Sequence, residues 1–148
     1  MIYILLADDD RDDCFFFKDA VEELKLPVQL TTVWDGEQLM RHLSQTDNVL
    51  PYALFLDLNM PRKNGHTCLI EIKSSKTLSN IPVIIFSTSY DEQVADELYK
   101  IGAHYYIRKP PAFSDFKEAI KSAYTFLQRN IGQPPKEKFL ISKQKPAL

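Results

Sequence analysis

Residues 53–58 read ALFLDL and residues 83–87 read VIIFS. Both stretches are short, nearly continuous apolar runs, and each reaches a polar residue, Asp57 or Ser87, at or next to its end. Such runs are typical of the central strands of a parallel sheet, which helices cover on both faces. These two stretches therefore predict an α/β protein with a buried parallel sheet.

The rest of the chain alternates strands and helices around these two runs. Further strand signals occupy residues 2–7, 29–34 and 104–107, and helical spacing of apolar residues occupies 11–24, 37–43, 67–78, a stretch ending at 101, and 114–129. Asp35 with Gln38 is expected to cap the second helix, and Ser89 with Glu92 the fourth, which Gly102 ends. Five alternating β–α units predict a five-stranded parallel sheet with helices on both faces.

The length of 148 residues predicts one domain, which we place at residues 1–130. Residues 131–148 lose the alternating pattern and read as a tail that contains Pro and Lys. A chain end of this kind is either mobile or docked, and the apolar triplet at residues 139–141 would provide the docking contact.

Charge and composition exclude several classes of protein. Lys plus Arg number 18 and Asp plus Glu 20, so the net charge of −2 argues against direct DNA binding and against an anionic-membrane binder. No apolar run approaches the roughly 20 residues of a membrane span, and the N-terminus lacks the basic region of a secretory signal. Cys14 and Cys68 show no metal-binding or redox spacing, which favours reduced thiols in a cytoplasmic protein.

Polar residues follow the strands at one end of the predicted sheet. Asp8, Asp9 and Asp10 follow the first strand, Asp57 ends the third, Ser87 and Thr88 end the fourth, and Lys109 follows the fifth. In open α/β sheets, ligands bind outside the carboxyl ends of the strands, where the strand order reverses. For the order 2-1-3-4-5, strands one and three flank that point, so we expect these aspartates to converge.

The chemistry of such a cluster points to phosphoryl transfer. Two carboxylates about 4 Å apart repel each other by ~4 kcal/mol at an effective dielectric constant of 20, so a cation is expected between them. Oxygen-only ligation suits Mg²⁺, which also binds phosphate oxygens. A lysine and a serine hydroxyl provide further contacts to a phosphoryl group, and an aspartate can itself be the nucleophile. The site therefore predicts Mg²⁺-assisted phosphorylation of an aspartate.

Five segments of the chain resemble the receiver domain of bacterial two-component response regulators. They are ILLADDD at 4–10, VWDG at 33–36, LFLDLNMPRKNG at 54–65, IPVIIFSTS at 81–89 and GAHYYIRKP at 102–110. The resemblance covers residues 1 to about 128 and is strongest to stand-alone receivers, such as the chemotaxis receiver and the receivers that partner cyanobacterial phytochromes. It implies a flavodoxin-like, doubly wound sheet of order 2-1-3-4-5.

The resemblance assigns roles to individual residues. Asp57 is expected to be the phosphoacceptor. Asp9 would bind Mg²⁺, or Mn²⁺ in its place, directly, Asp8 largely through water, and Asn59 through its backbone carbonyl. Asp10 extends the family's acidic pair to a triplet, which leaves open which two of the three aspartates face the metal.

A second set of family roles concerns the response to phosphorylation. The expected contacts to the phosphoryl group and the switch residues are Ser87, Thr88, Tyr106 and Lys109. Pro110 is expected to follow a cis peptide bond, as in the family.

The resemblance also implies the partners. The phosphoryl donor would be a phosphohistidine on a sensor histidine kinase or phosphotransfer protein, engaged through the first helix, where residues 15–17 are all Phe, and the loop after the fifth strand. The output would be an unknown downstream protein, or a second copy of the chain, contacting the face formed by helix four, strand five and helix five. Aromatic residues at 104–106, 124 and 126 motivate this surface, with packing under the tail as the alternative.

Two other functions remain to be compared with this one. A phosphorylation-independent interaction module would be expected to have lost site residues, and none is lost. A phosphohydrolase of the haloacid-dehalogenase type needs the motif DxDx[TV] after the first strand, where this chain has Asp12 in place of Thr or Val. We therefore expect a signalling phosphoacceptor that catalyses only its own phosphorylation and dephosphorylation.

Overall fold

A parallel sheet of six strands forms the centre of the computed structural model, which describes residues 1–45, 47, 49–129 and 132–141. The strand order is β2-β1-β3-β4-β5-β6, and every neighbouring pair is parallel. The strands are β1 (Ile2–Ala7), β2 (Val28–Val33), β3 (Ala53–Leu56), β4 (Val83–Ser87), β5 (Tyr105–Arg108) and β6 (Leu140–Ile141). The α/β class and the order of the first five strands are confirmed, whereas the expectation of only five strands is wrong.

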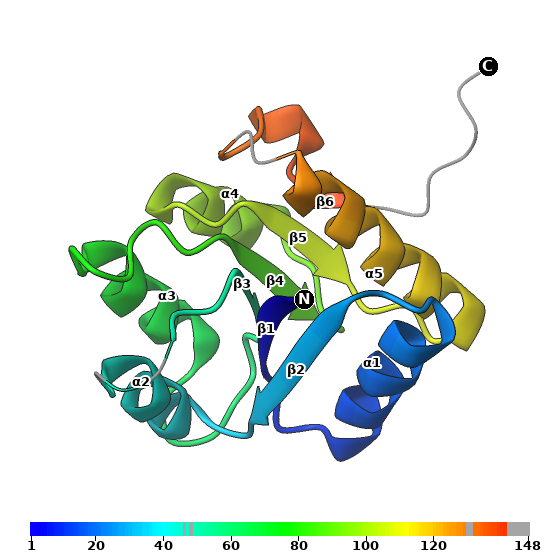
Figure 1. Cartoon of the computed structure of the whole chain (residues 1–148). Helices are drawn as coiled ribbons and strands as arrows, with labels where there is room; N and C mark the ends of the chain where they lie inside the picture. The colour runs from blue at the N-terminus through cyan, green and yellow to red at the C-terminus, as the bar shows by residue number, and fades with distance from the viewer. Residues whose placement is uncertain (46, 48, 130–131, 142–148) are drawn as a thin grey trace.

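Helices cover both faces of the sheet. They are α1 (Arg11–Glu23), α2 (Gly36–Ser44), α3 (Gly65–Ser74), α4 (Glu92–Ile101) and α5 (Phe113–Gln128), with a short 3-10 helix η1 (Lys136–Lys138). In Figure 1, α1 and α5 lie on one side of the sheet and α2, α3 and α4 on the other. This arrangement is the doubly wound form that the alternation of strands and helices predicts.

The central strands are buried because both of their faces contact helices. Every residue of β3 and β4 is buried. Side chains alternate between the faces, so Leu54 and Leu56 pack in the core beneath α2, α3 and α4, whereas Phe55 packs with α1 and α5. On that second face Phe17, Phe55 and Phe86 meet edge to face, with ring centroids 4.9–6.0 Å apart. The apolar runs therefore place the ends of β3 and β4 in a rigid core.

Side-chain caps set the starts of α1, α2, α3 and α4. Asp35 accepts a hydrogen bond from the backbone N–H of Gln38, which confirms the predicted cap of α2. The predicted cap of α4 is wrong: the helix begins at Glu92, so Asp91 and not Ser89 is at the capping position, and its side chain accepts from the first turn. Gly102 ends α4 with a φ of 127°, a backbone angle that favours glycine.

Part of the predicted tail is docked on the domain. The backbone N–H of Tyr106 donates to the carbonyl of Phe139 (2.9 Å), which adds β6 to the edge of β5. The side-chain amide of Gln133 donates to the carbonyls of Tyr99 and Ala103, and the Tyr99 hydroxyl donates to Pro134. The remainder of the predicted tail, residues 142–148, lies outside the described residues.

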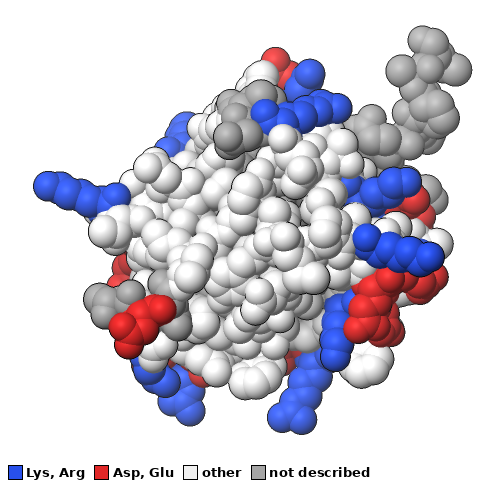
Figure 2. All heavy atoms as spheres, viewed as in Figure 1, with Lys and Arg blue, Asp and Glu red and all other residues white. Residues whose placement is uncertain are grey.

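Charged side chains are distributed unevenly over the surface. Figure 2 shows that, among the described residues, the middle of the face seen in Figure 1 is free of Lys, Arg, Asp and Glu side chains, which lie along its rim. The residues predicted for the site follow the opposite, carboxyl ends of the strands. Within the described residues, no helix combines the length and the apolar character that crossing a membrane requires.

Candidate functional site

Three carboxylates converge where β1 and β3 end. Asp8 and Asp57 follow these neighbouring strands and are buried, whereas Asp9 is exposed. The backbone N–H of Asp57 donates to the carbonyl of Ala7 (2.9 Å), which continues the sheet ladder past β3. One carboxylate oxygen from each aspartate lies within 4.8 Å of the others. The structure thus brings together the three aspartates that the sequence assigns to the site.

Lys109 provides the positive charge of this site. Its buried ammonium donates to Asp8 Oδ2 (2.6 Å) and Asp13 Oδ2 (2.8 Å) and lies 3.8 Å from Asp57 Oδ2. The backbone N–H of Lys109 donates to the carbonyl of Ser87 (2.7 Å), which holds the end of β5 beside that of β4.

Asp13 is the residue of the site that the sequence reasoning missed. It belongs to the acidic run at residues 8–13, in which the sequence analysis assigns roles only to the first aspartates. The available signal was its position four residues before the buried Phe17, because residues four apart share one face of a helix.

Burial dominates the electrostatics of the two inner carboxyls. It raises the pKa of Asp8, although Lys109 opposes the shift. It also raises the pKa of Asp57, to about 7, with Lys109 lowering the value and the charge of Asp8 raising it. Burial lowers the pKa of Lys109, but hydrogen bonds to Asp13 and Asp8 outweigh this effect and the net shift is upward. In the metal-free protein it is therefore energetically unfavourable for Asp8 and Asp57 to be ionised at the same time.

The donor set fits a hard divalent cation. Carboxylate oxygens are preferred ligands of Mg²⁺ and Mn²⁺, and an ion among them would offset the cost of burying ionised carboxylates and the repulsion of Asp57 by Asp8. Asn59 lies beside the cluster, where its backbone N–H donates to Asp57 Oδ1 (3.3 Å).

Gly65 allows the chain after β3 to pass close to the backbone of Asp57. Its N–H donates to the carbonyl of Leu58 (3.0 Å). A Cβ atom at position 65 would lie 2.2 Å from the backbone oxygen of Asp57, so glycine is the residue that fits this close approach.

The predicted switch residues lie beside the cluster at different depths. Ser87 is buried and its hydroxyl pairs with that of Ser89 (3.2 Å), whereas Thr88 is exposed. Tyr106 is buried, its hydroxyl donates to the carbonyl of Ser89, and its ring packs edge-on against Tyr90. The tyrosine side chain thus points inward and joins the β4–α4 loop to β5.

The prediction of a cis bond before Pro110 is wrong. No cis peptide bond occurs among the described residues, which include Lys109 and Pro110. An X–Pro bond prefers trans by only about 0.5–1 kcal/mol, so surrounding contacts decide the isomer and the dipeptide alone does not.

A groove of about 600 Å³ opens on the α1 side of Lys109. Asp13, Phe16, Lys109 and Phe113 contribute to its walls. Phe16, which lines the groove, is 42% exposed, and Phe15 beside it on α1 is 63% exposed, so apolar surface adjoins the part of the groove that Asp13 and Lys109 line.

Comparisons with known proteins agree with this geometry. The chain matches the response regulator receiver domain family over residues 4–121. It is 27% identical to the response regulator Rcp1 of Synechocystis sp. over 135 residues, which cover 88% of this chain and 92% of Rcp1. The solved structure of Mn²⁺-bound Rcp1 superposes with a TM-score of 0.81 at 26% identity, covering 90% of this chain and 99% of that one. The phosphorylated cyanobacterial phytochrome response regulator RcpA gives a TM-score of 0.81 at 31% identity, covering 90% and 98%.

Proposed function

Because the chain belongs to the response regulator receiver family, we propose that Asp57 accepts a phosphoryl group from a phosphohistidine in the presence of Mg²⁺. The observation that carries this proposal is the convergence of Asp8, Asp9 and Asp57 within 4.8 Å, with the ammonium of Lys109 beside them. The donor would be a sensor histidine kinase or a histidine phosphotransfer protein. The chain would act as a bacterial, cytoplasmic signalling phosphoacceptor and not as an enzyme on outside substrates.

The reaction is a transfer between two nucleophiles. A carboxylate oxygen of Asp57 bonds to phosphorus while the bond from phosphorus to the donor's imidazole nitrogen breaks, and the electron pair of that bond returns to the nitrogen. In the metal-free protein burial raises the pKa of Asp57 to about 7, whereas Lys109 lowers it by stabilising the ionised carboxylate that acts as the nucleophile. A phosphoryl oxygen would receive a hydrogen bond from Lys109 and from the Ser87 hydroxyl, with Thr88 at the exposed rim.

The cation site would be formed by Asp8, Asp9, Asp57 and the backbone carbonyl of Asn59. When bound, Mg²⁺ or Mn²⁺ would neutralise charge on the carboxylates and on the transferring phosphoryl oxygens. The Mn²⁺-bound form of Rcp1, which is 26% identical to this chain, supports the binding of a divalent cation.

The groove beside Lys109 is the proposed approach for the donor. Phe15 and Phe16 would bind apolar surface of the donor protein beside this groove, whose wall residue Lys109 lies 3.8 Å from Asp57 Oδ2. This surface agrees with the expected use of α1 and the β5–α5 loop.

The response to phosphorylation of Asp57 would be transmitted through Ser87 and Tyr106 to the surface around α4, β5 and α5. Phosphorylation would shift the population between two packings of these side chains. The alternative, that aromatic residues of this surface pack under the C-terminal segment, is supported by the contacts of Phe139 with Tyr99 and Tyr106. A downstream protein or a second copy would therefore meet η1 and β6 on this surface as well as α4 and α5.

The test is phosphorylation by a small donor. The protein is incubated with phosphoramidate and Mg²⁺, and its intact mass is measured. We expect a gain of one phosphoryl group, lost with Asp57→Asn or with a chelator, and retained with Asp12→Asn, which removes an exposed aspartate of α1. Labelling of the Asp57→Asn variant at the rate of the wild type would overturn the assignment. Survival of the signal in the chelator would remove the metal from the proposal.

A further inference from the structure

The ammonium of Lys109 is shared unequally among three carboxylates. Two of its three N–H groups have partners at hydrogen-bond distance, Asp8 Oδ2 at 2.6 Å and Asp13 Oδ2 at 2.8 Å. Asp57 Oδ2, at 3.8 Å, is beyond that distance. The lysine is therefore held closer to α1 than to the proposed phosphoacceptor.

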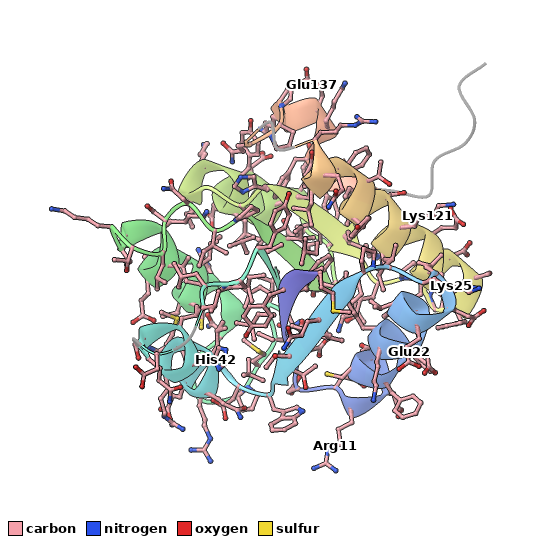
Figure 3. The ribbon with its side chains drawn as sticks, in the orientation of Figure 1. Arg11, Glu22, Lys25, His42, Lys121 and Glu137 are labelled. Carbon is pink, nitrogen blue, oxygen red and sulfur yellow. The ribbon has the colours of Figure 1, made fainter. Side chains whose placement is uncertain are left out.

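The start of α1 fixes the position of Asp13. Its backbone N–H donates to the side chain of Asp10, the residue that caps this helix (3.1 Å). Its side chain is 18% exposed and that of Lys109 only 4%, so solvent screens their contact weakly. Arg11, two residues earlier, is exposed and extends away from the domain (Figure 3), whereas Asp13 is turned toward Lys109.

We propose that Asp13 is a positioning residue that competes with the phosphoryl group on Asp57 for the ammonium of Lys109. This inference rests on the proposed function. A phosphoryl group on Asp57 adds negative charge and three acceptor oxygens beside Lys109. The charge of Asp13 repels that group and also holds the ammonium back from it. Asp13 thus weakens the phosphorylated state and limits its population.

The alternative role for Asp13 is a purely structural anchor. An anchor would preorganise Lys109, so its loss would weaken binding of the phosphoryl group. Competition predicts the opposite result: loss of the Asp13 charge would strengthen binding of the phosphoryl group. Asp13→Asn separates the two, because the amide oxygen still accepts a hydrogen bond from Lys109 while the negative charge is gone.

The experiment measures binding of beryllofluoride, a stable stand-in for the phosphoryl group on an aspartate. The full chain with saturating Mg²⁺ is titrated with beryllofluoride by isothermal titration calorimetry. We expect Asp13→Asn to bind about tenfold more tightly than the wild type, the lower end of the effect that a charge at this range has on a neighbouring group. Asp12→Asn, with the same change of net charge on the exposed side of the same helix turn, is expected to bind like the wild type.

The outcomes separate this inference from the proposed function. A wild-type protein that binds no beryllofluoride with Mg²⁺ would overturn both. A wild type that binds while Asp13→Asn binds equally or more weakly would overturn the role of Asp13 alone. Equal gains from Asp12→Asn and Asp13→Asn would also overturn it, because net charge would then be the cause. Asp13→Ser, which removes the same charge with a different side chain, must shift the affinity in the same direction as Asp13→Asn.

Discussion

The ring of Tyr106 packs edge-on against the ring of Phe139, with centroids 6.2 Å apart and planes at 77°. The same two residues share a backbone hydrogen bond, from the N–H of Tyr106 to the carbonyl of Phe139. Phe139 also meets the ring of Tyr99 on α4, with centroids 5.2 Å apart. The segment after α5 is therefore part of the hydrophobic core and lies against the aromatic residue that we assign to the switch.

Phe139→Ala should lower the free energy of unfolding by about 3 kcal/mol, because it removes a buried ring and leaves a cavity beside Tyr106. Urea unfolding followed by circular dichroism measures this loss. Phe15→Ala, at a position 63% exposed, is the control and should change stability by less than about 1 kcal/mol. Equal stability of Phe139→Ala and the wild type would mean that β6 is not held on the domain in solution.

The local sequence pattern was sufficient to predict most of the strands and helices, but not β6. The predicted strands at 2–7 and 83–87 have the observed bounds, since short apolar runs rich in β-branched or aromatic residues favour strands over helices. A two-residue strand such as Leu140–Ile141 has no measurable period, and its pairing depends on the free edge of β5 and on the rings of Tyr99 and Tyr106. Those contacts exist only in the folded protein.

The site was predictable to the extent that strand ends determine it. Parallel strands bring Asp8 and Asp57 together from positions far apart in the sequence, and the topology alone requires this. Asp13 reaches the site from within α1, so its role depends on where Lys109 points. The choice of Asp91 over Ser89 as the cap of α4 likewise depended on where the helix begins, and helix ends are the part of an element that sequence predicts least precisely.

Mg²⁺ should stabilise the folded protein by linkage. A ligand that binds only the native state at ten times its Kd contributes about 1.4 kcal/mol. For a domain of this size, that free energy corresponds to a rise in melting temperature of about 4 °C. Thermal melts with Mg²⁺ and with a chelator provide the comparison, and Asp9→Ala should abolish the difference. A wild-type melting curve indifferent to millimolar Mg²⁺ would count against the acidic cluster as a cation site.

Asp57→Asn should stabilise the metal-free protein in a pH-dependent way. Burial raises the pKa of Asp57 from 3.8 to about 7 in the folded state, so in this range the folded protein keeps a proton that the unfolded chain has lost. The free energy of unfolding of the wild type therefore falls from about pH 4 to pH 7, whereas asparagine contributes no such loss. The advantage of the variant should be small at pH 4 and greatest at pH 8, at most about 4 kcal/mol.

Urea unfolding in a chelator, at a series of pH values, measures the difference between Asp57→Asn and the wild type. Asp12→Asn controls for the general loss of one acidic side chain and should follow the wild type at every pH. A difference that stays constant from pH 4 to pH 8 would show that ionisation of Asp57 is not its cause.

Removal of residues 131–148 should make the protein self-associate. The truncation strips β6 from β5, so the backbone groups of Tyr106 and its neighbours lose their partners and the rings of Tyr99 and Tyr106 lose Phe139. An exposed strand edge beside apolar rings favours pairing with another chain. The matched control removes only residues 142–148 and leaves β6 in place. Sedimentation velocity over a range of concentrations should show a rising sedimentation coefficient for the longer truncation alone. A coefficient that stays equal to that of the control at every concentration would show that β6 does not protect this edge, and self-association through β5 would then be rejected.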